Sequence, residues 1–189
     1  MAMSEDRPDH EYAELLSQYE KWRAIYTSVG HAPRDEPVWE RGRLYLRVGY
    51  PFEGWSGYIV EGNQGGCDVL RVTTEHRNEP AESKIGFFTD IEDAGKYIIW
   101  NVGESLRISC RVDPIEWIWD DLGLDPRVEQ VSLDDYTSRF QLKSDPARYF
   151  VLQAGGIQPE NRLLPITYTE LDRELTNGLS VQRNAKDLP

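Results

Sequence analysis

The sequence predicts an α+β fold: a single domain in which an antiparallel sheet is covered by two or three helices. Two long segments place apolar residues at the three- and four-residue steps of a helix, and many short segments have strand-like patterns. No repeat or low-complexity block divides the 189 residues, and 39% of them are hydrophobic, which is enough for one core. We therefore assign residues 1–189 to one domain and expect 1–8 and 180–189 to be mobile tails.

The first helix is predicted from about Asp9 to Ser28, and Gly30 is placed to end it. Its apolar residues lie on one helical face: Tyr12, Leu15, Leu16, Tyr19, Trp22 and Tyr26. Leu44, Leu46 and Val48 then alternate with polar or aromatic residues, which is typical of a half-buried strand. Three more strands are expected over 58–60, 67–74 and 84–88, and the glycines between 62 and 66 suit a hairpin turn.

The second helix is expected from Thr89 to about Leu106. Residues 89–92 have the form of a capping box, in which the Thr89 hydroxyl accepts a backbone N–H and Glu92 reaches back to the Thr89 amide. Asp90, Glu92 and Asp93 suit the positive end of the helix dipole, so we interpret them as capping residues and not as a metal site. The pattern predicts one buried stripe: Ile91, Ala94, Ile98, Val102 and Leu106.

A dense apolar segment follows, with Ile115, Trp117, Ile118 and Trp119 close together. Aromatic residues dominate protein cores, so packing in the core is the first interpretation. They are also enriched at protein interfaces, so an exposed anchor for a partner is the second. The sequence leaves both open.

The C-terminal third predicts strands over 127–133, 136–142 and 149–154, and then a polar loop from Gly155 to Arg162. A second capping box, residues 167–170, opens a short helix, and Ile166 and Leu171 stand at the positions of a hydrophobic staple. Asn177 and Gly178 are placed to stop that helix.

We predict no catalytic residue, no metal site and no cofactor. His10, His31 and His76 lie far apart in the sequence, and Cys67 and Cys110 lack partners at zinc spacing. The two cysteines are interpreted as free thiols, with a disulfide left open. Ser56 follows Gly54 and Trp55, but Tyr58 stands where a nucleophile elbow has its second glycine. The acidic pairs 120–121 and 134–135 are interpreted as solvated turn residues.

Charge favours binding to another protein. The formal net charge is -12, with 33 acidic and 21 basic residues, so contact with nucleic acid is not expected. No apolar run is long enough to cross a membrane, and residues 1–6 do not have the pattern of a signal peptide, so we expect a cytoplasmic location. An acidic protein can be steered toward a basic partner surface by long-range attraction.

The stretch from Phe87 to Trp100, FFTDIEDAGKYIIW, resembles bacterial immunity proteins of polymorphic toxin systems, together with the strands before it and the 136–154 hairpin after it. The closest likeness is to the family of the immunity factor for tuberculosis necrotizing toxin. That resemblance implies a cytosolic antitoxin that binds a secreted NAD-glycohydrolase domain and blocks its active site. Residues 164–168 and 177–178 are also similar to the opening helix of the immunity superfamily related to yeast cell-wall assembly regulators, although that motif there precedes the sheet.

The sequence thus predicts a non-enzymatic antitoxin whose partner is a cognate protein toxin, with no nucleic acid and no membrane involved. We expect the partner-binding residues in the polar loop, where glycines allow projection and polar side chains can replace the hydrogen bonds of a substrate. They are Gln158, Glu160, Asn161 and Arg162. Two alternatives stay open: a non-catalytic adaptor or scaffold with a large exposed apolar patch, and an enzyme with a dispersed site in a deep pocket.

Overall fold

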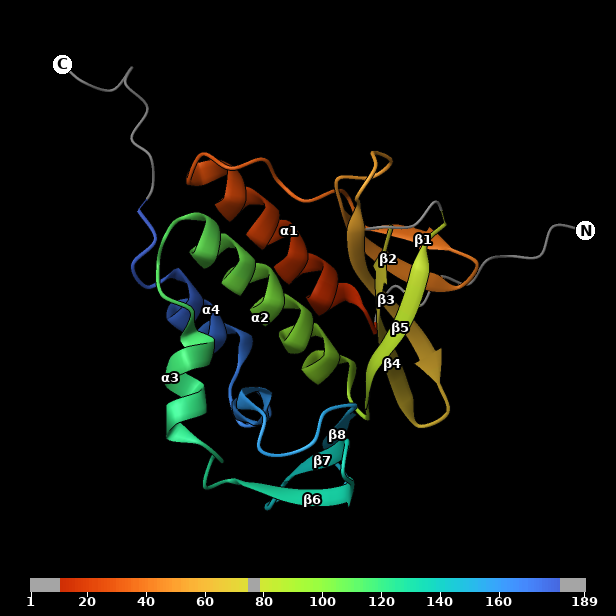
Figure 1. The fold of residues 1–189 in the computed structure, drawn as a ribbon, viewed down its shortest axis with the longest axis vertical. Helices are drawn as coiled ribbons and strands as arrows, with labels where there is room; N and C mark the ends of the chain where they lie inside the picture. Colours follow the sequence, from red (N-terminus) through yellow and green to blue (C-terminus); the bar gives the residue numbers. More distant parts are fainter. Residues whose placement is uncertain (1–10, 75–78, 181–189) are drawn as a thin grey trace, which may run out of the picture.

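An eight-stranded antiparallel sheet and four α-helices make up the fold (Figure 1). The computed structural model describes residues 11–74 and 79–180, so the predicted tails 1–8 and 180–189 lie outside the described residues, except for Ser180. The strands are β1 (Val38–Glu40), β2 (Arg43–Val48), β3 (Ser56–Asn63), β4 (Gly66–Thr73), β5 (Ala81–Phe88), β6 (Val128–Asp134), β7 (Thr137–Leu142) and β8 (Tyr149–Leu152). The helices are α1 (Ala13–Ser28), α2 (Ile91–Ser109), α3 (Ile115–Leu122) and α4 (Tyr168–Thr176), with a short 3-10 helix, η1 (Pro159–Leu163).

The strand order is β1-β2-β3-β4-β5-β8-β7-β6, which confirms the predicted α+β class. Each neighbour in the first five strands follows directly in sequence, and the β3–β4 hairpin turns at Gly65, whose φ of 81° favours glycine. The chain then leaves the sheet for α2 and α3. It returns so that β8 pairs with β5, with Phe87 opposite Val151.

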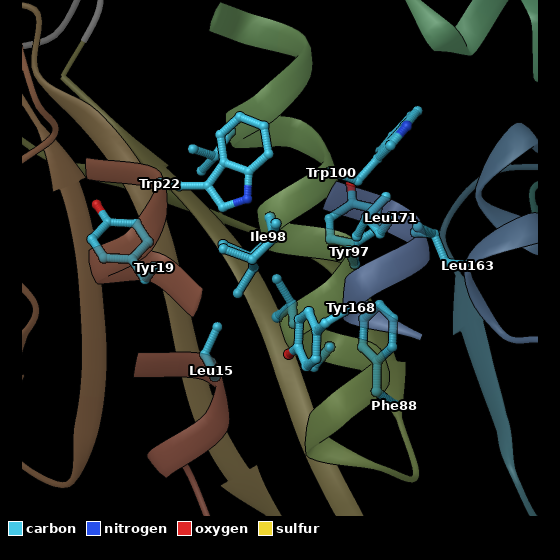
Figure 2. Packing of buried hydrophobic residues seen from close by; sticks show 14 of the residues in the cluster. Leu15, Tyr19, Trp22, Phe88, Tyr97, Ile98, Trp100, Leu163, Tyr168 and Leu171 are labelled. Carbon is cyan, nitrogen blue, oxygen red and sulfur yellow. The ribbon is translucent and has the colours of Figure 1, made fainter. Parts of the chain in front are cut away.

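α1 and α2 lie side by side and cover one face of the sheet (Figure 1). Tyr19 and Trp22 of α1 and Ile98 of α2 are fully buried, and Figure 2 shows these side chains between the two helices and the strands. Burying an aromatic or aliphatic side chain of this size stabilises the fold by roughly 1.5–3 kcal/mol relative to leaving it exposed. The apolar periodicity of the predicted first helix is therefore confirmed, with Leu16 as the partly buried member.

α4 packs against α2 next to two glycines and also contacts α1, because Trp22 Nε1 donates to the Asp172 carboxylate at 2.7 Å. A Cβ at Gly95 would lie 1.9 Å from the Tyr168 hydroxyl oxygen, and a Cβ at Gly103 would lie 2.7 Å from Leu175. The glycines therefore permit close helix contact, and α2 is buried on more sides than the single predicted stripe. The predicted capping box of α4 is confirmed, because the Thr167 hydroxyl accepts from the Glu170 amide and the Glu170 carboxylate accepts from the Thr167 amide.

The predicted capping box at the start of α2 is wrong. Asp90 is the N-cap, and its Oδ1 accepts the Glu92 amide at 2.8 Å. Thr89 instead joins the helix start to β8, since its hydroxyl donates to the Tyr149 carbonyl and accepts from the Tyr149 amide, both at 2.9 Å. A partner sixty positions away in sequence thus replaces the local one.

We expect Asp90→Ala to lower the free energy of unfolding by about 1 kcal/mol, the usual cost of losing an N-cap side chain. Chemical denaturation of the parent and the variant measures this difference. Glu92→Ala is the matched control, because the Glu92 side chain makes no capping bond and its ion contacts with Lys96 and Arg148, at 3.8 and 3.5 Å, are long and partly exposed, so a much smaller loss is expected. Equal losses in the two variants would contradict the assignment of Asp90 as the cap.

The acidic residues at the start of α2 have different roles: Asp90 caps the helix, and Asp93 forms a buried ion pair. Asp93 is buried, and its carboxylate contacts Lys96 Nζ at 2.7 Å and accepts two hydrogen bonds at 2.7 Å from Arg148. Lys96 Nζ also donates to the carbonyl of Ile166 at 2.9 Å. The prediction of Asp93 as a capping residue is therefore wrong. Asp93 is the centre of a network that ties α2 to Arg148, just before β8, and to Ile166, just before α4.

Candidate protein-binding surface

α3 is fixed at its N-terminal end and along its inner face. Pro114 precedes its first residue, and the Glu104 carboxylate of α2 accepts the Ile115 amide at 3.0 Å. Burial raises the pKa of Glu104, against the smaller lowering effects of the Ile115 amide and the Arg107 charge. Ile115 and Trp119 are buried, and Trp119 stacks on Trp100 of α2 with the two ring planes 2° apart.

The other sides of α3 face solvent. Trp117, Ile118 and Leu122 are 62%, 56% and 58% exposed. Ile118 and Leu122 are four residues apart and form a ridge, with Trp117 roughly a quarter turn away. The exposed carboxylates of Glu116, Asp120 and Asp121 lie among them on the same helix. We call these six residues the α3 face. The predicted apolar segment thus divides between the two interpretations that the sequence left open, with Ile115 and Trp119 in the core and Trp117 and Ile118 exposed.

The predicted polar loop does not project. Residues 159–163 form η1, and Asn161 is fully buried. The Asn161 carboxamide accepts the Asp125 amide at 2.8 Å and donates to the Gln158 carbonyl at 2.7 Å. Gln158 itself donates back to the Gly155 carbonyl. The expectation of an exposed loop is therefore wrong, because the polar side chains satisfy backbone groups of the protein itself.

Arg162 closes the C-terminal end of α3. Its guanidinium donates to the carbonyls of Gly123 and Leu122, both at 3.1 Å. These are carbonyls that the helix leaves without an internal partner. Gly123, with φ of 63°, ends the helix. Arg162 therefore helps to fix the C-terminal end of the α3 face. Partner binding by the four loop residues stays a prediction: Gln158, Glu160, Asn161 and Arg162.

Glu160 is a partly buried acid without a counter-charge among the described residues. Burial raises the pKa of its carboxyl group to about 7, and the Glu116 carboxylate of α3 raises it further. Its Oε2 atom is enclosed and has no hydrogen-bond partner among the described residues. The Glu160 carboxyl group therefore keeps its proton to a higher pH than an ordinary glutamate does, which suits the enclosed position of Oε2.

A second exposed apolar group lies on the β6–β7 hairpin, at the edge of the sheet. Val131 and Leu133 of β6 and Tyr136 of the turn are exposed, and Tyr136 is 80% exposed. The turn packs on the loop after β8, because Gly155 approaches the Asp135 carbonyl too closely for any side chain. The acidic pairs 120–121 and 134–135 are exposed, as the sequence predicted.

Groups that could perform chemistry are dispersed. Within residues 11–74 and 79–180, no three His, Cys, Asp or Glu side chains are placed to hold a metal ion. Ser56 begins an antiparallel strand, and Cys67 and Cys110 are free thiols, the first buried and the second partly so. His31 is half-buried after α1, while His10 and His76 lie outside the described residues. Glu104 and Glu160 line none of the three cavities described for the protein.

None of the helices in the described ranges is long and apolar enough to cross a bilayer. The chain matches no family model, no curated protein and no solved structure.

Proposed function

We propose that the protein is a cytoplasmic antitoxin that binds a cognate protein toxin through the α3 face and occludes the toxin's active site. The observation that carries this proposal is the exposed aromatic and aliphatic cluster on a helix fixed at both ends. Large side chains held on a rigid element lose little freedom on binding, which is the property of an interface anchor. The sequence resemblance to immunity proteins supports an NAD-glycohydrolase domain as the toxin.

Charge defines the surface that such a toxin should present. Glu116, Asp120 and Asp121 surround the apolar ridge, and the whole chain carries a formal charge of -12. The complementary surface has an apolar cleft for Trp117 and Ile118 with Lys and Arg at its rim. Long-range attraction then speeds encounter, while the buried apolar contact slows dissociation.

We expect Trp117→Ala to weaken toxin binding by at least about 30-fold, the effect of losing about 2 kcal/mol at an interface anchor. The test uses a purified NAD-glycohydrolase toxin domain, with binding kinetics by surface plasmon resonance and inhibition of NAD hydrolysis at increasing molar ratio. The loss should appear mainly as faster dissociation. Tyr136→Ala is the matched control, because Tyr136 is also an exposed aromatic residue but belongs to the hairpin.

Raising the salt concentration should slow association of the protein with the toxin much more than it speeds dissociation.

If Trp117→Ala bound the toxin like the parent while Tyr136→Ala bound it more weakly, the interface would lie on the β6–β7 hairpin and not on the α3 face. Binding without inhibition of the toxin would instead favour an adaptor, which the exposed apolar side chains also suit. Saturable turnover of NAD by the purified protein alone would overturn the non-enzymatic proposal.

A further inference from the structure

The largest of the described cavities is basic, although the protein is strongly acidic. It has a volume of about 410 Å³ and lies where the end of α1, the segment before β1, strands β2 to β4 and helix α2 meet. Two guanidinium groups, Arg34 and Arg71, line it, and no carboxylate does. None of its lining residues belongs to the α3 face. Cavities of this size hold small organic molecules.

Arg34 is a buried cation without a counter-ion. It is 8% exposed and its Nε has no hydrogen-bond partner in the described parts of the chain, while its guanidinium contacts the uncharged hydroxyl groups of Tyr19 and Tyr26. Two other buried arginines have partners that Arg34 lacks: Arg47, whose Nε is likewise unpartnered, forms a two-point pair with Glu40 at 2.7 and 2.8 Å, and Arg107 donates to backbone carbonyls at both ends of its guanidinium. A buried charge is costly when it is unpaired, so Arg34 is poised for an anion that the protein does not itself provide.

Arg71 adds a second positive charge from the sheet. It lies on β4 opposite Tyr58 of β3, and no carboxylate of residues 11–74 or 79–180 is within ion-pair distance of Arg71 or Arg34. The Tyr58 hydroxyl lies close enough to both guanidinium groups that they lower its pKa, against the larger raising effect of burial. The two cations therefore converge on one region of the cavity.

The wall formed by α2 offers acceptors. Ser105 and Ser109 donate their hydroxyl hydrogens to backbone carbonyls one turn earlier, at 2.8 and 2.9 Å, and the Asn101 amide nitrogen donates to the Tyr97 carbonyl at 2.8 Å. The oxygens of these three side chains are left to accept. A ligand with an anionic group next to the two arginines and hydroxyl groups next to α2 would give hydrogen-bond partners to both sides of the cavity.

We propose that this cavity binds a small hydroxyl-bearing phosphate monoester, with the phosphate between Arg34 and Arg71 and the hydroxylated body against Asn101, Ser105 and Ser109. Charge balance selects phosphate. A phosphate monoester carries nearly two negative charges at neutral pH and neutralises both arginines, whereas one carboxylate would neutralise only one. The planar guanidinium fork also matches the geometry of phosphate oxygens.

Isothermal titration calorimetry at constant ionic strength tests the proposal, with ribose 5-phosphate, ribose and inorganic phosphate as probes. Ribose 5-phosphate should bind with a submillimolar dissociation constant, inorganic phosphate at least about fivefold more weakly, and ribose not measurably. Arg71→Gln should weaken ribose 5-phosphate binding at least about tenfold, the loss of one charge-assisted contact. Arg71 is exposed, so this variant should fold.

Arg173→Gln is the matched control, because it changes net charge equally at a 74% exposed side chain on α4 and should bind like the parent. Arg34→Gln should also lose binding, with its folding checked by circular dichroism. Absence of heat with ribose 5-phosphate up to 10 mM, or equal affinity in Arg71→Gln and the parent, would overturn the site. Equal affinity for inorganic phosphate and ribose 5-phosphate would overturn the part of the proposal that concerns the α2 wall.

Discussion

Asp93→Ala is expected to destabilise the protein by about 3–5 kcal/mol, the cost of removing one partner from a buried ion pair. The Lys96 side chain is fully buried, and burial already lowers its pKa, while the Asp93 carboxylate is its nearest counter-charge at 2.7 Å. Without Asp93, the buried ammonium group keeps only backbone carbonyls and the more distant Glu92 carboxylate, at 3.8 Å, as partners. Urea denaturation of the parent and the variant measures the loss.

The double variant Asp93→Ala with Lys96→Met is the control for this explanation. It removes the uncompensated cation together with its partner, so we expect it to recover a large part of the stability that Asp93→Ala alone loses. Lys96→Met alone should cost less than Asp93→Ala, because Asp93 keeps its two hydrogen bonds from Arg148. If the two single losses simply added in the double variant, the network would not be coupled through the buried charge.

The second large effect is a loss of stability with rising pH that depends on Glu160. Burial raises the pKa of this carboxyl group in the folded protein to about 7, from 4.5 in an unperturbed glutamate. Between these values the folded protein binds more protons than the unfolded chain, so stability falls as pH rises through this window. The favourable contribution is complete below pH 4.5 and is lost above about pH 7. Its upper limit is about 3 kcal/mol.

Glu160→Gln should remove this pH-dependent step, because a carboxamide carries no charge at any pH. Thermal and chemical unfolding from pH 4.5 to pH 8.5 would show a flatter stability profile for the variant than for the parent. Glu53→Gln provides a control of equal charge change at an exposed position and should keep the parental profile. A parental slope in Glu160→Gln would mean that another group carries the step.

Much of the fold follows from interactions between residues close in sequence. The periodicity around Trp22 locates α1, the glycines after β3 locate the hairpin, and the Thr167 capping box locates α4. Each of these features depends on neighbours within one helical turn or one hairpin. Sequence patterns report such local geometry directly, so these elements and the α+β class could be predicted, whereas helix α3 and strand β1 were not.

The candidate sites depend on contacts between distant segments. Thr89 has the sequence context of a helix cap, yet Tyr149 of β8 engages its hydroxyl, and Asp90 takes the cap. Asn161 and Arg162 resemble projecting loop residues, yet they bind the backbone at the end of α3. The sequence alone determines that the chain is acidic, builds one α+β domain and has an aromatic segment after α2. Tertiary packing decides that Trp119 is buried while Trp117 is exposed, and that Arg34 and Arg71 meet in one cavity, because only the folded chain determines which side chains lose contact with water.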